Sequence, residues 1–261
     1  MSGIRSRTTV HTSSESVASL RARLERAERE AAAHQRQLER YAADLRESYR
    51  RERARAQQLR RSYKATVRAL SNAVEARDAY TGKHAERVAA YGLAIARVAG
   101  IDVADEPQLE FGFLLHDIGK VGVPDAILFK SAALSKDEFN RIASHAEIGS
   151  EILRHVDFLA EATLIVRHHH ERWDGTGYPD GLQGDQIPLA ARVFAVADTL
   201  DALTSDRPYR AAVGWAAARA VIREGAGTQF DPMMIEAYDT LGDDTFARLS
   251  EGVHSPSSLP R

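Results

Sequence analysis

The sequence contains no cysteine, and this absence excludes several kinds of chemistry. A chain without thiols forms no disulfides and has neither a thiolate metal site nor a cysteine nucleophile. Any metal ion must therefore be held by nitrogen and oxygen donors, which the ten histidines and the many carboxylates supply.

Long apolar runs are also missing. No stretch approaches the roughly 18 consecutive apolar residues that a membrane span needs, and the first residues carry no apolar signal segment. We therefore expect a cytoplasmic protein. With 261 residues, of which 44% are hydrophobic, there is room for one large domain and an extension.

Glycine and proline are absent between Val17 and Gly82, where alanine, arginine and glutamate dominate. This composition predicts one long helix over residues 17–77, preceded by a disordered leader over residues 1–16 that is rich in Ser, Thr and Arg. A stripe of residues at multiples of seven predicts a dimeric, parallel coiled coil, although Glu52 interrupts it and the companion seam is poorer. The stripe consists of Leu24, Ala31, Leu38, Leu45 and Leu59, and the companion seam of Leu20, Ala27, His34, Tyr41, Ser48 and Arg55.

The near-neutral total charge conceals two opposed halves. Residues 1–80 contain 18 Lys and Arg against 10 Asp and Glu, a formal charge of +8, whereas the remainder contains 17 against 27, a charge of −10. The arginines would suit nucleic acid, but glutamates are interleaved with them at helical spacing. A solvated coiled-coil flank explains this pattern without further assumptions.

The rest of the chain predicts an all-α domain over residues 78–252, followed by a flexible tail over residues 253–261. Short amphipathic segments succeed one another, and no alternating strand pattern competes with them. Residues 135–138 form a capping box that predicts one helix bearing Phe139, Ile142, His145, Ile148 and Ile152. The Gly- and Pro-rich loop 173–188 is long for a compact domain and is therefore a candidate functional segment.

Histidines and carboxylates recur through this domain. His116 and Asp117 are adjacent at the end of an apolar helical run, His84 precedes them, and His145, the run from His168 to His170 and Asp198 follow. Imidazole and carboxylate donors suit divalent iron, manganese or zinc. The pattern therefore predicts a metal cluster.

Four motifs in this order resemble an HD-GYP domain, a branch of the HD metal-dependent phosphohydrolases. They are DAYTGKH at residues 78–84, HDIGKVGVP at 116–124, HHERWDGTGYP at 169–179 and the segment 198–210. The resemblance covers residues 78–229. It implies an HD-type helical bundle that opens the ring of cyclic di-GMP, a bacterial second messenger.

The resemblance also implies a set of metal ligands and a reaction. Two ions, by this resemblance iron or manganese, would share a bridging hydroxide that attacks phosphorus, and Asp117 would be the bridging carboxylate. The implied ligands, each with a suitable donor atom here, are His84, His116, Asp117, His145, His169, His170 and Asp198.

One position departs from the family pattern. Members of the three-metal type carry a glutamate four residues before the first histidine, where this chain has Tyr80. A phenol with a pKa of about 10 is a poor ligand for a hard cation. We therefore expect two ions and, as the main product, the linear dinucleotide pGpG.

Further residues match positions that contact substrate or assist the reaction in this family. Lys120, Arg207 and Arg210 would contact phosphate, for which lysine and arginine supply cationic donors. Asp78 would contact a base or order the site. Asp117, Lys120 and Asp201 are the predicted catalytic residues, although Asp201 would equally suit orienting a ligand or a water.

The intact triplet Gly177, Tyr178 and Pro179 would line the substrate cleft, with Gly175 and Gly177 permitting backbone angles that other residues resist. The resemblance implies that this face can also contact diguanylate cyclase domains. Two other functions stay open at this point: a non-catalytic effector that binds the nucleotide or a cyclase, and a hydrolase of another cyclic dinucleotide.

Overall fold

The structure is a computed structural model that describes residues 17–77, 83–103, 107–206 and 210–254. Asp78, Tyr80, Arg207 and the predicted leader lie outside these residues. The described residues form helices and no β-strand, which confirms the all-α prediction. The helices are α1 (Val17–Glu75), α2 (His84–Val98), α3 (Pro107–Leu115), η1 (Ile118–Gly122), α4 (Asp125–Leu128), α5 (Lys136–Ala143), α6 (His145–Leu153), η2 (Asp157–Leu159), α7 (Ala160–His168), η3 (Gly184–Gln186), α8 (Leu189–Thr204), α9 (Trp215–Glu224), α10 (Pro232–Thr240) and α11 (Asp243–His254).

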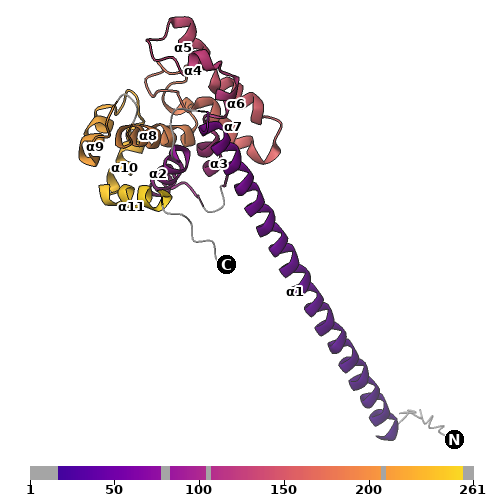
Figure 1. Cartoon of the computed structure of the whole chain (residues 1–261). Coiled ribbons are helices and arrows are strands. Elements are labelled where there is room, and N and C mark those ends of the chain that lie inside the picture. The colour runs from indigo at the N-terminus through magenta and orange to yellow at the C-terminus, as the bar shows by residue number, and fades with distance from the viewer. Residues whose placement is uncertain (1–16, 78–82, 104–106, 207–209, 255–261) are drawn as a thin grey trace, which may run out of the picture. The chain divides into compact units, whose positions relative to one another are not determined.

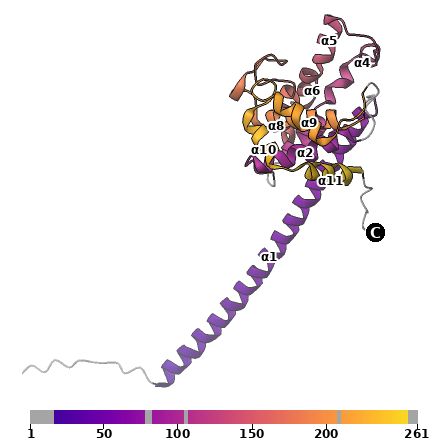
Figure 2. The same ribbon diagram turned by 90° about the vertical axis from the view of Figure 1, so that its left-hand side faces the viewer.

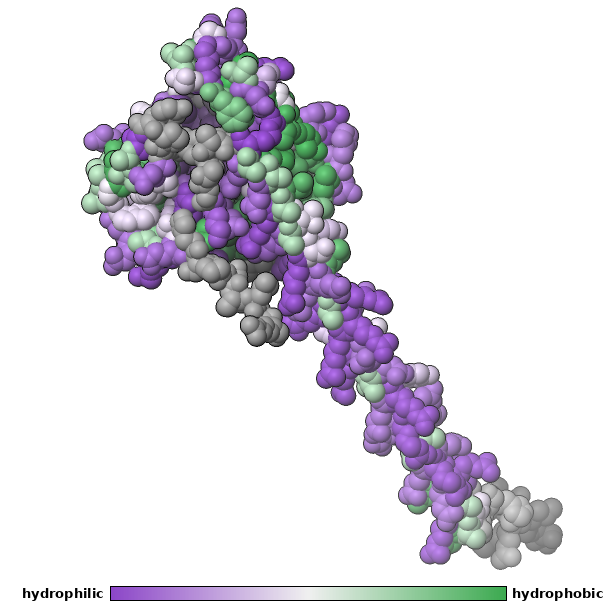
Figure 3. Space-filling view, in the orientation of Figure 1, coloured by the Kyte–Doolittle hydropathy of each residue, from purple (hydrophilic) through white to green (hydrophobic). Residues whose placement is uncertain are grey.

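The chain divides into two units, Met1–Arg61 and Ser62–Arg261. The described part of the first unit is the helical stretch 17–61 of α1, whose surface is largely hydrophilic with hydrophobic residues at intervals (Figure 3). The predicted stripe residues Leu24, Leu38 and Leu45 are exposed in the single chain, as an unpaired seam would be. No helix among the described residues is long and apolar enough to cross a membrane.

The last turns of α1 belong to the second unit. Val67, Ser71 and Val74 are buried there, and the ring of Tyr63 stacks on Phe158 at a centroid distance of 4.1 Å. The second unit therefore includes α1 from Ser62 onward as well as the helices that follow. The reason is that the apolar phase of α1 changes near Tyr63, so that this end of the helix packs into the core.

The core of the second unit lies between α2, α3, α7 and α8, which pack against one another (Figure 1). Phe113 of α3 and Phe194 of α8 are fully buried, with ring centroids 5.6 Å apart. Helix α2 approaches Phe113 so closely that a Cβ at Gly92 would lie 2.4 Å from its ring. This packing brings the ends of several helices to one place.

The capping box at Ser135 is confirmed. The Ser135 hydroxyl accepts a hydrogen bond from the backbone N–H of Glu138, whose carboxylate accepts one from the backbone N–H of Ser135. The single helix predicted to follow is wrong, because α5 ends at Ala143 and α6 begins at His145. Phe139 on α5 is exposed, whereas His145 at the start of α6 is buried.

Gly119 allows η1 and α6 to make an unusually close backbone approach. A Cβ at this position would lie 1.8 Å from the carbonyl oxygen of His145 and 2.5 Å from the backbone nitrogen of Gly149. Backbone atoms cannot rotate away as a side chain can. Only glycine therefore lets the 3₁₀ turn that follows Asp117 pack against the first turn of α6.

We predict that Gly119→Ala separates η1 from α6 and destabilises the fold by about 1–3 kcal/mol or more, the usual cost of overpacking. Thermal unfolding followed by circular dichroism measures this. The matched control is Gly122→Ala, whose new Cβ would meet only the Ile148 side chain at 3.0 Å. Equal melting temperatures for the two variants would contradict the proposed role of Gly119.

Candidate metal centre

A cavity of about 270 Å³ opens in the second unit where the first residues of α2 and α6 meet the ends of α3 and α7. Six of the seven predicted metal ligands line it, together with Lys120 and Tyr178. The other wall is formed by Val74 and Glu75 of α1 and by Ile142. The predicted ligands therefore come together although they are far apart in the chain.

Five histidines and Asp117 form two groups of three donors, and within each group the donor atoms lie within 4.8 Å of one another. One group joins the first residue of α2 to the end of α3, and the other joins the first residue of α6 to the end of α7. The first group is His84, His116 and Asp117, and the second is His145, His169 and His170.

Three of these histidines are held in the same way. Nδ1 of His116, His145 and His169 each lies 2.7–2.8 Å from the backbone carbonyl three residues earlier, at Phe113, Ile142 and Val166. A carbonyl can only accept, so each Nδ1 carries the proton and donates it. In the neutral ring, Nε2 then holds the lone pair that binds a metal. Burial lowers the pKa of His116, but the neighbouring Asp117 carboxylate outweighs it and raises that pKa, so this ring must release its Nε2 proton when an ion binds.

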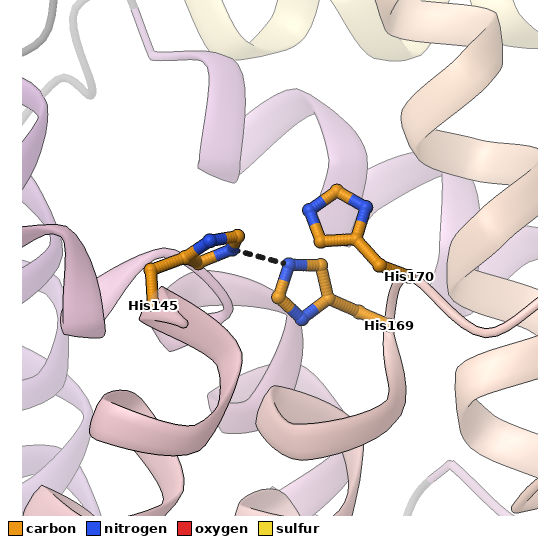
Figure 4. Close-up of side chains that lie close together, drawn as sticks. All are labelled: His145, His169 and His170. Atoms are coloured by element: carbon orange, nitrogen blue, oxygen red, sulfur yellow. Dashed lines mark hydrogen bonds between the residues drawn. The ribbon is translucent and has the colours of Figure 1, made fainter. Parts of the chain in front are cut away.

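Nε2 of His145 lies 3.1 Å from Nε2 of His169 (Figure 4). Because both rings donate through Nδ1, neither neutral Nε2 has a proton to place between them, and two lone pairs this close repel each other. A cation resolves the conflict. Two nitrogens that bind the same ion, each at about 2.0–2.1 Å, lie about 3 Å apart. The spacing of these two Nε2 atoms therefore fits two ligands of a single ion.

Asp117 lies between the two groups. Its Oδ2 is 3.1 Å from Nε2 of His116, and its Oδ1 is 3.5 Å from Nε2 of His145. Lys120 approaches the same carboxylate, with Nζ 2.8 Å from Oδ2. Burial alone would raise the pKa of Asp117, but His116 and Lys120 outweigh it and hold that pKa well below its usual value. The carboxylate is therefore ionised and has one oxygen toward each group.

Burial affects the histidines of the second group in the opposite sense. It lowers the pKa of His145, lowers that of His169 well below its usual value, and lowers that of His170 to about 3. All three rings are therefore neutral at physiological pH. A histidine must lose its proton to bind a metal, so these ligands are already in the binding form.

His84 is held by an acid instead of a carbonyl. Its Nδ1 donates to Oδ2 of Asp201 at 2.8 Å, and its Nε2 lies 3.5 Å from Oδ1 of Asp198. Asp201 is buried and also accepts from Nε of Arg87 at 2.6 Å. It lies behind His84 and is not among the residues that line the cavity, so its contacts are those of a residue that orients a ligand.

His168 differs from its two neighbours because both of its nitrogens are in use. Nδ1 donates to the carbonyl of Leu164 at 2.9 Å, and Nε2 lies 3.0 Å from Oδ2 of Asp180. Glu171 is buried and accepts from the backbone N–H groups of Asp180 and Leu182. The two hydrogen bonds to Glu171 and the contact between His168 and Asp180 anchor the loop 173–188 beside the cavity. The sequence did not reveal this role of His168 and Glu171.

Arg87 and Glu75 were also missed from the sequence. Arg87 lies one turn after His84 on α2, a spacing that could have indicated a shared acid partner. Glu75 accepts from the backbone N–H of Ala85 at 2.6 Å and so caps the helix that begins with His84. No sequence pattern indicated this role of Glu75, because the residue is one of many charged residues in the long helix α1.

Tyr178 lines the cavity, and its ring stacks on His170 at a centroid distance of 4.7 Å. Gly175 has a positive φ of 79°. The conformational argument for Gly177 is wrong, because its φ is not positive. Glycine is needed there since a Cβ would lie 2.4 Å from the backbone nitrogen of Arg172.

The predicted substrate residues divide into three sets. Lys120 lines the cavity. Arg210 is exposed, donates to the carbonyl of Ala202 and is not part of the cavity wall. Asp78 and Arg207 are outside the described residues. The donors that the structure does bring together, five imidazoles and two carboxylates, fit divalent transition metals.

Comparison with known proteins identifies a family and relatives that this chain resembles. The family model described as HD domain matches residues 68–234. The cyclic di-GMP phosphodiesterase response regulator RpfG of Xanthomonas campestris is 41% identical over 174 residues, which are 66% of this chain and 46% of that protein. The 3'3'-cGAMP-specific phosphodiesterase 3 of Vibrio cholerae is 42% identical over 166 residues, or 64% of this chain and 36% of that protein.

A solved structure shares the fold. The cyclic GMP-AMP-specific phosphodiesterase V-cGAP3 of Vibrio cholerae superposes with a TM-score of 0.57 at 20% identity, over 74% of this chain and 53% of that one. The chain belongs to the HD domain family, as its motifs indicated. It spans less than half the length of the two curated relatives.

We predict that Asp201→Asn weakens metal binding at least tenfold, within the 10–100-fold range typical of lost outer partners. An amide can donate to Nδ1 of His84, which moves the imidazole proton to Nε2 and removes the lone pair. Titration of Mn²⁺ into metal-free protein measures the affinity. The control is Asp231→Asn, a similarly buried acid paired with Arg192 outside the cavity. Unchanged affinity in Asp201→Asn would refute the orienting role.

Proposed function

We propose that this chain is a metal-dependent phosphodiesterase that hydrolyses cyclic di-GMP. The observation that carries the proposal is the position of Asp117, whose two oxygens face histidines of two different donor groups. A carboxylate in that position suits the bridge of a two-ion centre. RpfG, named a cyclic di-GMP phosphodiesterase, supports the choice of substrate.

The first group and Asp198 would hold one ion, the second group the other, and Asp117 would contact both. The resemblance favours iron or manganese, whereas the nitrogen and oxygen donors suit iron, manganese and zinc alike. Such ions supply a water of lowered pKa and neutralise charge on a phosphodiester.

The protein groups have separate tasks around the phosphate. Lys120 lies on the cavity wall with its ammonium beside Asp117, so it can donate to a phosphate oxygen. The Nδ1 protons of His116, His145 and His169 are committed to backbone carbonyls, which keeps these rings from serving as acids. The ring of Tyr178 stacks on His170 beside these groups.

We infer two ions and not three because Tyr80 replaces the carboxylate of the three-metal type. The main product would then be pGpG, since the second cleavage lacks an additional cation for the newly freed terminal phosphate. The alternative substrate is 3'3'-cGAMP, on which a relative of similar identity acts by its name. The contact with diguanylate cyclase domains stays a prediction.

We expect protein purified anaerobically with Mn²⁺ or Fe²⁺ to convert cyclic di-GMP mainly to pGpG, and Asp117→Ala to lose more than nine-tenths of this activity. The reason is that the bridge between the two donor groups is removed. Chromatography of the products from cyclic di-GMP, 3'3'-cGAMP and cyclic di-AMP makes the measurement. The control Asp125→Ala alters an exposed carboxylate paired with Arg77 outside the cavity.

Rapid formation of GMP without a dinucleotide intermediate would contradict the two-ion account. Preferential turnover of 3'3'-cGAMP would replace the proposed substrate with the alternative one. Binding of cyclic di-GMP without any turnover under these conditions would instead support a non-catalytic effector.

We also propose that the chain forms a homodimer through the first unit. The heptad stripe of α1 exposes Leu38 and Leu45 by 67% and 72%, which in a long isolated helix leaves the apolar seam in water. Pairing with the same seam of a second copy would bury these residues. The charged flanks, including the Arg51–Glu47 pair at i,i+4 spacing, would stay solvated.

We predict that a chain beginning at Ser62 is folded but monomeric, whereas the full chain is dimeric at tens of micromolar. Light scattering measures the mass, and circular dichroism confirms folding. In the full chain, Leu45→Glu should weaken the dimer, whereas Gln57→Glu on the opposite face of the heptad should not. A monomeric full chain would leave α1 as a single solvated helix and defeat this proposal.

A further inference from the structure

A second cavity, of about 290 Å³, adjoins the metal centre. The two cavities share His170, Tyr178 and Asp198 in their walls, so the second begins where the first ends. The rest of the second cavity's lining includes His169 and aromatic, amide, hydroxyl and guanidinium groups, together with Glu171, whose carboxylate accepts from the backbone N–H groups of Asp180 and Leu182. This lining differs in character from the metal centre and suits an uncharged, planar, polar group.

The aromatic part of the lining is Tyr178 and Phe139. Their rings meet edge to face with centroids 6.0 Å apart and planes at 83°. Phe139 lies on α5, which projects from the rest of the second unit in both ribbon views (Figures 1 and 2), and its side chain is 49% exposed. An exposed phenylalanine at the mouth of a polar cavity offers a free face on which a base can stack.

The polar part is centred on Gln229. Its Nε2 donates to Oγ1 of Thr199 at 3.4 Å, and its backbone carbonyl accepts from the N–H of Trp173 at 3.3 Å. Thr199 directly follows Asp198 on α8. The amide is therefore held beside the metal centre, and it has both acceptor and donor capacity beyond the contact with Thr199.

Arg172 supplies a fixed cationic edge. Its Nε donates to Oγ1 of Thr176 at 3.0 Å and its Nη2 donates to Asp174 at 3.1 Å, so the guanidinium plane is oriented while half-buried in the cavity wall. A guanidinium pairs well with the O6 and N7 acceptors of guanine. Amide side chains and aromatic faces likewise recognise unstacked bases.

We propose that this second cavity is the subsite for one guanine base of the cyclic dinucleotide, with the base stacked on Phe139 and its polar edge read by Gln229 and Arg172. The proposal rests on the proposed function and extends it to substrate selection. A base held here lies next to Asp198 and Tyr178, so its attached phosphate would reach the metal centre through the shared wall. The residues that bind the base are then separate from those that bind the ions.

The test compares Phe139→Ala with Phe129→Ala in the full, Mn²⁺-loaded chain. Both phenylalanines are 49% exposed, but Phe129 lines neither cavity. Steady-state kinetics are measured with cyclic di-GMP and with methyl p-nitrophenyl phosphate, a phosphodiester without a base. We expect Phe139→Ala to raise KM for cyclic di-GMP by about tenfold relative to KM for the small diester, which is the scale of one lost base–aromatic stack. Phe129→Ala should leave this ratio unchanged.

Gln229→Ala provides a second, independent measurement. We expect it to raise KM for cyclic di-GMP more than it lowers kcat, and to reduce the preference for cyclic di-GMP over cyclic di-AMP by about fivefold or more, since a polar reading group is lost. Suppose that Phe139→Ala and Gln229→Ala both turn over cyclic di-GMP with an unchanged ratio of its KM to that of the small diester, and with an unchanged preference over cyclic di-AMP. That result would refute the subsite but not the proposed function. Turnover of the small diester without turnover of any cyclic dinucleotide would refute the proposed function, and the subsite with it.

Discussion

The site depends on where the imidazole protons are held. The backbone carbonyls of Phe113, Ile142 and Val166 accept hydrogen bonds from the Nδ1–H groups of His116, His145 and His169. The carboxylate of Asp201 accepts the corresponding hydrogen bond from His84. Each contact is local or buried, so the tautomer is set by the fold before any ion arrives. The lone pairs that remain converge, and at 3.1 Å the closest two repel each other in the absence of a cation. Much of the binding affinity should come from relieving that arrangement.

The fold serves this constraint by bringing helix ends together. His84 begins α2, His145 begins α6, and His116 and His169 follow the last turns of α3 and α7. At the end of a helix, a histidine ring can turn back to the carbonyl of the preceding turn while its other nitrogen points outward. The backbone approach at Gly119 then sets the distance between Asp117 and His145, and with it the separation of the two donor groups.

The sequence predicted the kind of residue at the site but not its supports. Paired histidines and aspartates in long motifs were recognisable because metal chemistry restricts their types. The buried acid partner of His84, the glycine approach at Gly119 and the loop anchor Glu171 depend on residues distant in the chain, so no local pattern encodes them. Likewise the break after Ala143 has neither glycine nor proline to mark it, and apolar periodicity continues across it. The missed break separates Phe139, which is exposed on α5, from His145, which is buried at the start of α6.

The proposed centre has one ion in each donor group, and Asp117 joins the two ions. A crystal structure of the Mn²⁺-loaded chain, with anomalous scattering recorded to locate manganese, tests this arrangement. We expect two anomalous peaks roughly 3.5–4 Å apart. One would be bound by Nε2 of His145 and His169, the other by Nε2 of His84 and His116, with an oxygen of Asp117 on each. A single peak, or two peaks that Asp117 does not join, would contradict it.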